Sequence, residues 1–398
     1  MPRRPVLAVL SQIPSSIWVL GFVSLLMDVS SEMIHSLLPM FLVTALGAST
    51  ITLGIIEGFA EATALIIKIF SGVLSDYLGK RKDIVLFGYG LSALTKPLFA
   101  LTSSVTLVFI ARITDRLGKG IRGAPRDALI ADLAPEGLRG ASFGLRQSLD
   151  TLGAVLGPLL AFCFMLLFAS HFRMVFALAV IPALIAVLLI VVGVKEPQNT
   201  PHHKVLNPLS LSNLKLLSFS YWWVCGIGAM ITLARFSEAF LVLRVMQGGV
   251  DMAIVPLFLV AMNIIYSLSA YPLGKLADQM SHANLLIIGL IALCIADLIL
   301  AANNHWSYTL IGICFWGLHM GATQGLLAVM VADTSPLNLR GTAYGFFYLL
   351  SGIAMLLASI IAGLVWEKVG ASFTFYLGAI FSFFACFALF FWKKSMCH

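Results

Sequence analysis

The chain has 398 residues, of which 60% are apolar and only 11% are charged, whereas soluble domains are roughly 45–50% apolar. This composition excludes a soluble globular protein and indicates a membrane protein. The net charge of +7 does not indicate a nucleic-acid partner, because the basic residues gather in the loops that one membrane face would share, for example Lys80 and Arg340. The other face keeps Arg173 and Lys368. The positive-inside rule then places both termini in the cytoplasm.

Apolar runs long enough to cross a bilayer as helices, which takes about 20 residues, recur along the whole chain. Because lipid-exposed irregular backbone is excluded, they predict an all-α membrane protein with twelve transmembrane helices. The first run is too long for a cleavable signal peptide and lacks a small-residue cleavage site. The expected spans are 16–46, 51–77, 84–102, 104–124, 140–169, 173–194, 216–246, 251–277, 283–302, 307–332, 340–366 and 371–392. Gly123 and Pro125 are expected to kink or end the fourth span.

The polar segment 195–215 lies near the midpoint of the chain and is predicted to be a cytoplasmic linker. It would join two pseudo-symmetric six-helix bundles, residues 1–194 and 216–398. The halves repeat, since GVLSD at 72–76 matches GKLAD at 274–278, and ADLAPEGLRG at 131–140 matches ADTSPLNLRG at 332–341. Such parallel repeats are typical of transporters whose substrate site lies between the halves near the bilayer midplane.

Three segments resemble motifs of the major facilitator superfamily of secondary transporters. GVLSDYLGKRK, starting at Gly72, is similar to the loop motif G-x-L-x-D-R-x-G-R-K, and RITDRLGKG at 112–120 is similar to R-x-x-Q-G-x-G-x-G. GAVLGPLLA resembles the helix-5 antiporter motif through Gly153, Gly157 and Pro158, although its final glycine pair is missing. The resemblance extends over nearly the whole chain and implies the fold of that superfamily, and the third motif favours export.

The resemblance also implies that the spans 16–46, 104–124, 216–246 and 307–332 line a central cavity. It further implies a cytoplasmic charge cluster, here called the latch, which pairs helix ends in one conformation and must break when that side opens. The expected latch residues are Gly72, Asp76, Lys80 and Asp132 in the first half and Gly274, Asp278, Asp333 and Arg340 in the second.

Ionisable side chains inside the spans need partners or water, since each costs about 2.5–3.5 kcal/mol at the bilayer centre on insertion scales. Asp28, Glu32 and His35 share one helix face at i, i+4 and i+7. The first half is rich in such groups, while the second half is mainly aromatic and polar. The expected substrate-binding residues are Asp28, Glu32, His35, Glu57, Arg112, Arg116, Lys119, Asp150, Arg235, Glu238, Trp316, His319, Tyr344 and Tyr348.

Other charged groups in the spans are expected to be structural or have no assigned role. Arg122, Arg126 and Asp127 lie near the cytoplasmic ends, where long side chains can reach the interface. Lys96 and Asp297 lie on spans that the resemblance places outside the cavity wall, and no role is predicted for them.

These patterns predict a proton-coupled transporter that works by alternating access. Burial disfavours the charged form of a carboxyl group and a nearby cation favours it, so substrate arrival or helix movement can switch its protonation. Asp28 and Glu32 are the expected proton carriers, with Glu61 as a further candidate. Arg112 and Arg116 would tune these carboxyl groups and contact the substrate.

The expected substrate is a small organic solute that is exported, either a drug-like compound or a polar metabolite such as a siderophore. Uptake of a siderophore or another charged metabolite by proton symport is the main alternative, and a non-transporting receptor or scaffold is a further one. The chain contains no G-x-x-x-x-G-K-[ST] motif and no cysteine pair of the C-x-x-C type, so we expect neither an enzyme nor a metal or cofactor site. We expect a monomer in the cytoplasmic membrane.

Overall fold

The structure is a computed structural model, and it describes residues 12–195, 214, 216–277, 279–302, 305–323, 325–336 and 339–396. All elements of regular secondary structure in these ranges are helices, which confirms the prediction of an all-α protein. Most of the linker 195–215 and the expected latch residue Asp278 lie outside the described residues.

The first half of the chain folds into long helices joined by short turns. The ends of the second long helix carry typical capping residues. Ser49 Oγ accepts a hydrogen bond from the Thr52 amide at its start, and Gly79 ends it with a φ of 62°, which favours glycine. The helices are α2 (Ser15–His35), α3 (Leu38–Met40), the π-helix η1 (Phe41–Ala45), α4 (Thr50–Leu78), α5 (Arg81–Leu101), α6 (Val105–Leu133), α7 (Arg139–Leu167), α8 (Phe172–Leu178) and α9 (Val180–Gly193).

The second half follows the same pattern, and two of its predicted spans are interrupted, as are the first-half spans 16–46, after His35, and 173–194, at Ala179. The span expected at 216–246 is broken between Ala234 and Ala239, and the one at 307–332 is broken near Gly325, whose φ is 76°. The helices are α11 (Phe219–Ala234), α12 (Ala239–Gln247), α13 (Pro256–Ala277), α14 (His282–Ala302), α15 (Trp306–Thr323), α16 (Leu326–Asp333), α17 (Arg340–Lys368) and α18 (Ala371–Met396).

Ten helical segments of the described chain are long and apolar enough to cross a membrane. The long helices α4 and α6 are not among them. In α6 the reason is its charge, since Arg112, Asp115, Arg116, Lys119 and Arg122 lie within three turns. The other helix that departs from the simple apolar pattern, α4, carries Glu57, Glu61 and Lys68.

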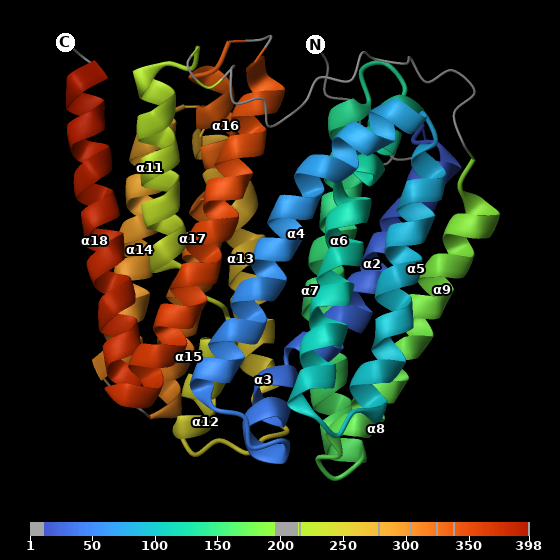
Figure 1. Cartoon of the computed structure of the whole chain (residues 1–398), viewed down its shortest axis with the longest axis vertical. Coiled ribbons are helices and arrows are strands. Elements are labelled where there is room, and N and C mark those ends of the chain that lie inside the picture. Colours follow the sequence, from blue (N-terminus) through green and yellow to red (C-terminus); the bar gives the residue numbers. More distant parts are fainter. Residues whose placement is uncertain are drawn as a thin grey trace.

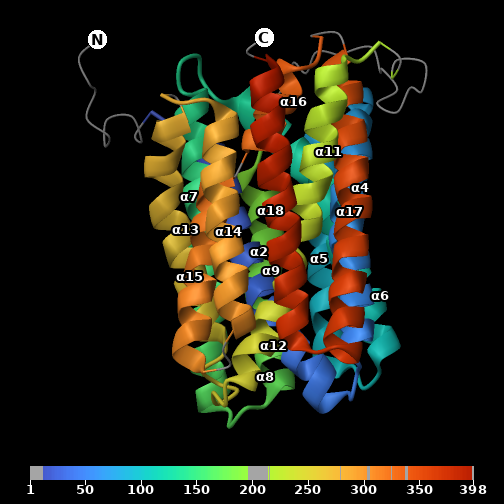
Figure 2. The same ribbon diagram turned by 90° about the vertical axis from the view of Figure 1, so that its left-hand side faces the viewer.

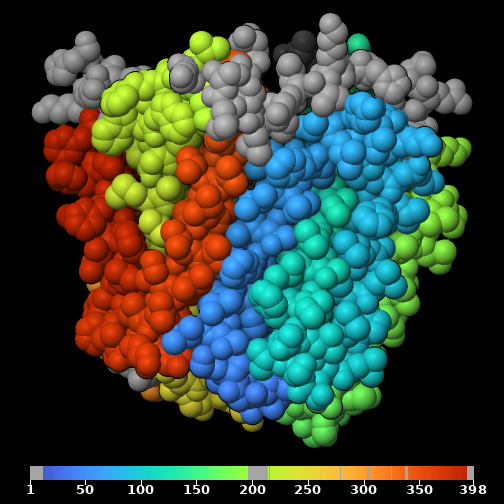
Figure 3. Space-filling model, in the orientation of Figure 1, coloured from blue at the N-terminus to red at the C-terminus, as the bar shows by residue number. Residues whose placement is uncertain are grey.

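The helices of the two halves form two groups that meet along α4 and α17. Figure 1 shows α2 to α9 on one side and α11 to α18 on the other. Figure 2 views the molecule from the side of the second group, with α13, α14, α15 and α18 toward the viewer. In Figure 3, α4 and α17 touch along the front face. Small residues permit this approach, since a Cβ on Gly363 would lie 2.5 Å from the Thr50 carbonyl oxygen.

A hydrophobic core closes the end of the molecule at which α3, α8 and α12 lie, the lower end in Figure 1. Phe41, Phe240 and Trp366 belong to this core, and each is less than a tenth exposed. The ring of Phe240 lies 5.6 Å from that of Trp366, and the ring of Phe41 lies 5.3 Å from that of Phe176. Since these residues come from both halves of the chain, the core seals the two groups of helices against each other at this end.

The fourth span does not end at Gly123 and Pro125, because α6 continues without interruption to Leu133. A proline removes one backbone donor and usually ends or kinks a helix. Here α6 packs along both α4 and α5, and these contacts hold the helix beyond the proline. As a result Arg126 and Asp127 are helical and continue the charged face of α6.

Candidate functional site

A partly open cavity of about 490 Å³ lies between the two groups of helices. Its wall is formed by α2, α4, α6 and α7 from the first half and by α13, α15, α17 and the break between α11 and α12 from the second. It begins near His35 and Ser237, above the hydrophobic core, and extends along α6 as far as Asp127. The cavity brings together these expected residues: Asp28, Glu32, His35, Glu61, Arg116, Lys119, Asp150, Arg235 and Glu238.

The glycines of α7 bring the acidic face of α2 to the cavity wall. A Cβ on Gly153 would lie 3.0 Å from Asp28 Cβ, and one on Gly157 would lie 2.5 Å from Glu32 Cβ. Both glycines are buried where α7 packs against α2. The expected motif residues Gly153 and Gly157 therefore lie directly against the expected proton carriers, and Pro158 is buried beside them within α7.

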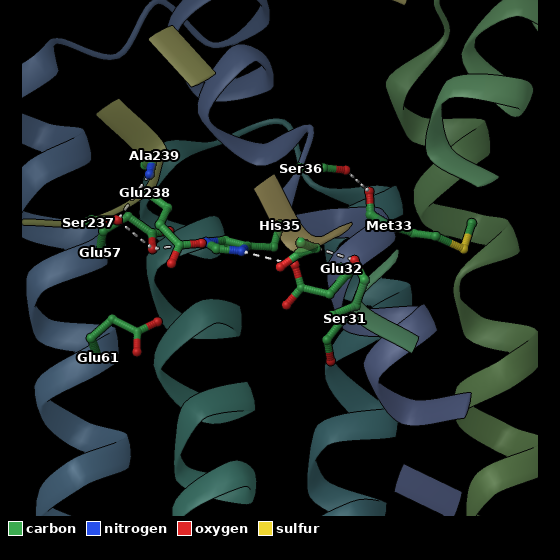
Figure 4. Close-up of polar contacts among 12 residues, drawn as sticks. Ser31, Glu32, Met33, His35, Ser36, Glu57, Glu61, Ser237, Glu238 and Ala239 are labelled. Atoms are coloured by element: carbon green, nitrogen blue, oxygen red, sulfur yellow. Dashed lines mark hydrogen bonds and ion pairs between the residues drawn. The ribbon is translucent and has the colours of Figure 1, made fainter. Parts of the chain in front are cut away.

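Six side chains from α2, α4 and α6 form a continuous series of polar contacts, here called the charge chain: Glu32, His35, Glu57, Arg112, Glu61 and Arg116. It starts at the cavity, where His35 Nδ1 lies 3.4 Å from Glu32 Oε2. The other ring nitrogen, Nε2, lies 3.7 Å from Glu57 Oε2. Figure 4 shows the imidazole of His35 pointing between the two carboxyl groups.

The interior of the charge chain is a bidentate ion pair. Arg112 Nε and Nη2 donate to the two carboxylate oxygens of Glu57 at 3.0 and 2.8 Å, and the side chains are 2% and 0% exposed. Arg112 also lies 3.8 Å from Glu61, and Glu61 pairs with Arg116 at 3.1 Å. Glu61 and Arg116 both line the cavity, so the charge chain begins and ends at the cavity wall. Glu57 and Arg112 were expected to contact substrate, but they lie behind the wall and link its charged groups.

The helix break between α11 and α12 places a second-half side chain on the charge chain. Ser237 Oγ donates a hydrogen bond of 3.4 Å to Glu57 Oε2, and Figure 4 shows Ser237 directed toward Glu57. Arg235 and Glu238, on either side, form an ion pair of 3.5 Å at the cavity. Sequence reasoning missed Ser237 because no proline or glycine marks this break, although the charged pair inside an apolar run was a usable signal.

Four expected substrate-binding residues on α15 and α17 lie outside the cavity wall. Trp316 is fully buried against Phe236, and the Nδ1 of buried His319 lies 2.8 Å from the Gly289 carbonyl oxygen. Tyr344 donates its hydroxyl to the Ala328 carbonyl oxygen and stacks on Tyr348. These contacts are with the second half itself, except that the ring of Tyr348 also lies 5.6 Å from Nζ of the cavity residue Lys68.

The cavity wall also holds charged residues that the sequence analysis left outside the binding site. Arg126 pairs with Asp127 at 3.2 Å, and both line the cavity together with Lys68 and Arg122. Arg126 and Asp127 face the cavity because α6 remains helical to Leu133. The spacing of four residues between Arg122 and Arg126 was the signal for this, and the expected end of the span at Gly123 and Pro125 hid it.

Lys96 forms a buried ion pair of 2.9 Å with Asp115. Asp297 is fully buried, and neither of its carboxyl oxygens has a hydrogen-bond partner within the described part of the chain.

At the ends of α4, α5 and α6, Arg81 is the cation that joins the expected latch carboxylates. It lies 3.2 Å from Asp76 and 2.5 Å from Asp132. Lys80 is exposed and makes no ion pair with a described residue. Gly72 packs near Ala124.

In the second half the expected latch residues are less connected. Asp333 lies 3.7 Å from His282 Nδ1 with both side chains partly exposed. Arg340 is exposed at the start of α17, and Gly274 has open space around it. No ion pair between the halves joins these residues in the ranges that the structure describes.

Apolar helices around a charged, partly open cavity define a multi-pass membrane transport protein. A family model described as the Major Facilitator Superfamily matches residues 20–262 and 239–396. The chain belongs to this superfamily of secondary transporters, as the motifs in the sequence had suggested.

Relatives cover most of the chain. An uncharacterized MFS-type transporter of Methanocaldococcus jannaschii is 33% identical over 377 residues, which is 93% of this chain and 92% of the relative. The quinolone resistance protein NorA of Staphylococcus aureus is 23% identical over 309 residues, covering 76% of this chain and 78% of NorA.

Solved structures show the same fold at low identity. The nucleoside transporter NupG has a TM-score of 0.75 at 13% identity and covers 97% of this chain and 100% of its own. A POT family transporter in complex with 5-aminolevulinic acid has a TM-score of 0.79 at 14% identity, covering 97% and 99%. These two structures agree with the family assignment and carry no information on the substrate.

Proposed function

We propose that this protein exports a small organic solute by proton-coupled alternating access across the cytoplasmic membrane, with both termini in the cytoplasm. Its twelve spans would form two six-helix bundles, residues 1–194 and 216–398, acting as a monomer. The similarity to a quinolone resistance protein and the glycine motif on α7 support export. The hydrophobic core at one end and the cavity that extends toward the other support an inward-facing conformation. Arg81 keeps its contacts with Asp76 and Asp132 there, so this part of the latch would not have to break when that side opens.

The observation that carries the proton coupling is the position of three carboxyl groups on the cavity wall. Asp28 makes no ion pair with any described residue, whereas Glu32 contacts His35 and Glu61 contacts Arg116. A proton on Asp28 or Glu32 would change the net charge of the wall at the start of the charge chain. Because Ser237 touches Glu57, such a change would reach the helix break in the second half, which gives a physical link between protonation and movement.

Proteoliposomes with an imposed pH gradient test this function. The probes are norfloxacin, citrate and dihydroxybenzoate, and the readouts are accumulation of each probe and the accompanying movement of protons. We expect gradient-driven exchange of at least one probe, abolished in Asp28→Asn and Glu32→Gln and reduced in Glu61→Gln. Glu136→Gln removes an acid from the exposed turn between α6 and α7 and should leave transport unchanged.

The direction of proton movement decides between export and its alternative. Protons that move opposite to the probe indicate export by antiport, and protons that move with it indicate uptake by symport. Full gradient-driven transport in both Asp28→Asn and Glu32→Gln would refute the assignment of the proton carriers.

A further inference from the structure

The charges on the cavity wall do not balance once the ion pairs are removed. Five of the six acids on the wall contact a basic group: Glu32, Glu61, Asp127, Asp150 and Glu238. Asp28 alone has no such contact. Three cations of the wall, Lys68, Lys119 and Arg122, have no carboxylate within 4.0 Å among the residues that the structure describes. Once Asp28 is set against one of these cations, two positive charges of the wall remain without an ion-pair partner among the described residues.

Two of these cations lie on the same part of the wall. The side chain of Lys68, on α4, passes over Gly123 of α6, where a Cβ would lie 3.8 Å from its Cγ, Cδ and Cε atoms. Lys119 lies one turn before Gly123 on the same face of α6 and is exposed to the cavity. The stem of Lys68 thus lies against the backbone of Gly123, one turn from Lys119, and both lysines line the cavity.

The third cation is held differently. Arg122 donates a hydrogen bond of 2.5 Å to Ser92 Oγ, and its guanidinium lies 4.6 Å from the centre of the Tyr89 ring. Both partners belong to α5, so Arg122 is fixed at the back of the wall and adds positive charge without reaching far into the cavity. The two lysines remain the groups that can contact a ligand.

The opposite wall offers apolar surface beside the polar residues of the helix break and Asn263. Phe236, Tyr266, Met320 and Met355 line the cavity from the second half of the chain. Lys68 Nζ itself lies 5.6 Å from the ring centre of Tyr348, on α17 of that half. A ligand held by the lysines would therefore have its remaining atoms against aromatic rings and thioethers and would touch both halves.

We propose that the cavity binds an organic anion, with a carboxylate or phosphate group between Lys68 and Lys119 and an aromatic or aliphatic body against the second half. Two ammonium groups on the wall of a partly enclosed cavity attract an anion more strongly than they would in bulk water. The inference rests on the proposed function, because it assigns the ligand of the transport cavity.

Calorimetric titration of the full-length protein in phosphatidylcholine nanodiscs tests this site. The probes share one ring system: naphthoate and naphthyl phosphate as anions, naphthylmethylammonium as a cation and naphthylmethanol as a neutral control. Inorganic phosphate and dihexanoyl phosphatidate test a free anion and a lipid headgroup. Each probe is titrated into the wild type, Lys68→Gln, Lys119→Gln and the charge-preserving Lys68→Arg and Lys119→Arg. Lys275→Gln removes the same charge from an exposed position on α13.

We expect the naphthyl anions to bind at least about tenfold more tightly than the alcohol and the ammonium compound. Each glutamine variant should weaken the anions by about tenfold or more, while the arginine variants and Lys275→Gln bind nearly as the wild type does. The inference is overturned if naphthoate and naphthylmethanol bind equally, if neither naphthyl anion binds, or if both glutamine variants keep wild-type affinity. Binding of phosphatidate or inorganic phosphate without the naphthyl anions would also overturn it, because the site would then hold no organic solute.

The same preparations in liposomes separate this inference from the proposed function. Lysine-dependent binding without gradient-driven flux of any bound anion would leave the anion site standing and refute transport. Gradient-driven flux of a neutral or cationic solute that Lys68→Gln and Lys119→Gln do not change would support transport and refute the anion site.

Discussion

Replacing either Glu57 or Arg112 alone should destabilise the protein, whereas replacing both together should change its stability little. Its two hydrogen bonds of 3.0 and 2.8 Å join side chains that are 0% and 2% exposed. Removing one partner of such a buried pair typically costs about 3–5 kcal/mol, because a charge remains buried without compensation. We therefore expect Arg112→Met to lower the free energy of unfolding by this amount.

The substitution of the other partner should cost a similar amount, and the double substitution should cost less. Arg112 keeps Glu61 at 3.8 Å in Glu57→Met, and Glu57 keeps His35 at 3.7 Å in Arg112→Met. Both single losses should therefore lie near the lower end of this range, at about 3 kcal/mol. In the double variant both desolvation costs are absent, so its stability should return to within about 1 kcal/mol of the wild type.

Equilibrium unfolding in mixed micelles of dodecyl maltoside and sodium dodecyl sulfate, followed by tryptophan fluorescence, measures these differences as a double-mutant cycle. Arg340→Met, at the exposed start of α17, is the matched control and should change stability little. The reasoning fails if Arg112→Met is as stable as the wild type, or if the double variant loses the sum of the two single losses.

Three other substitutions test separate features in the same unfolding assay. Gly157→Ala should destabilise the protein by about 1–3 kcal/mol, because its Cβ would meet Glu32 Cβ at 2.5 Å. Gly140→Ala is the control, because Gly140 has open space around it, and it should be neutral or stabilising. Equal effects of the two substitutions would contradict the close packing of Gly157 against α2. Asp297→Ala should raise stability by about 1–3 kcal/mol, because it removes a buried carboxyl group that has no hydrogen-bond partner in the described chain; a loss would show that this group is satisfied. Arg81→Gln should lower the free energy of unfolding by about 1 kcal/mol, because it removes the contacts with Asp76 and Asp132. Lys80→Gln should cause no measurable change. A larger loss in Lys80→Gln than in Arg81→Gln would show that Lys80 is the latch cation, as the sequence predicted.

The cavity wall shows which kind of prediction a sequence supports in a membrane protein. The spacing of Asp28, Glu32 and His35 places them on one face of a helix, and the structure turns that face toward the cavity because two glycines of α7 admit it. The motifs that begin at Gly72 and Gly153 similarly indicated the superfamily, which the family model confirms. In each of these cases the information lies within one helix or one short segment.

Pairing between helices could not be predicted in the same way. Glu57 and Glu61 are one turn apart on α4, yet the first is sealed against Arg112 while the second reaches the cavity. Which of them is buried depends on the rotation of α4 against α6, and many remote contacts set that rotation. The same holds for Lys96, whose partner Asp115 comes from a neighbouring helix.

The sequence by itself determined that the chain is helical, spans a membrane and concentrates its buried charges in the first half, because apolar length and periodicity are local properties. Only the tertiary structure decided that α6 continues past Pro125, that Ser237 reaches Glu57 and that two lysines of the wall lack an acidic partner among the described residues. These outcomes depend on distances between side chains far apart in the chain, and packing alone sets those distances.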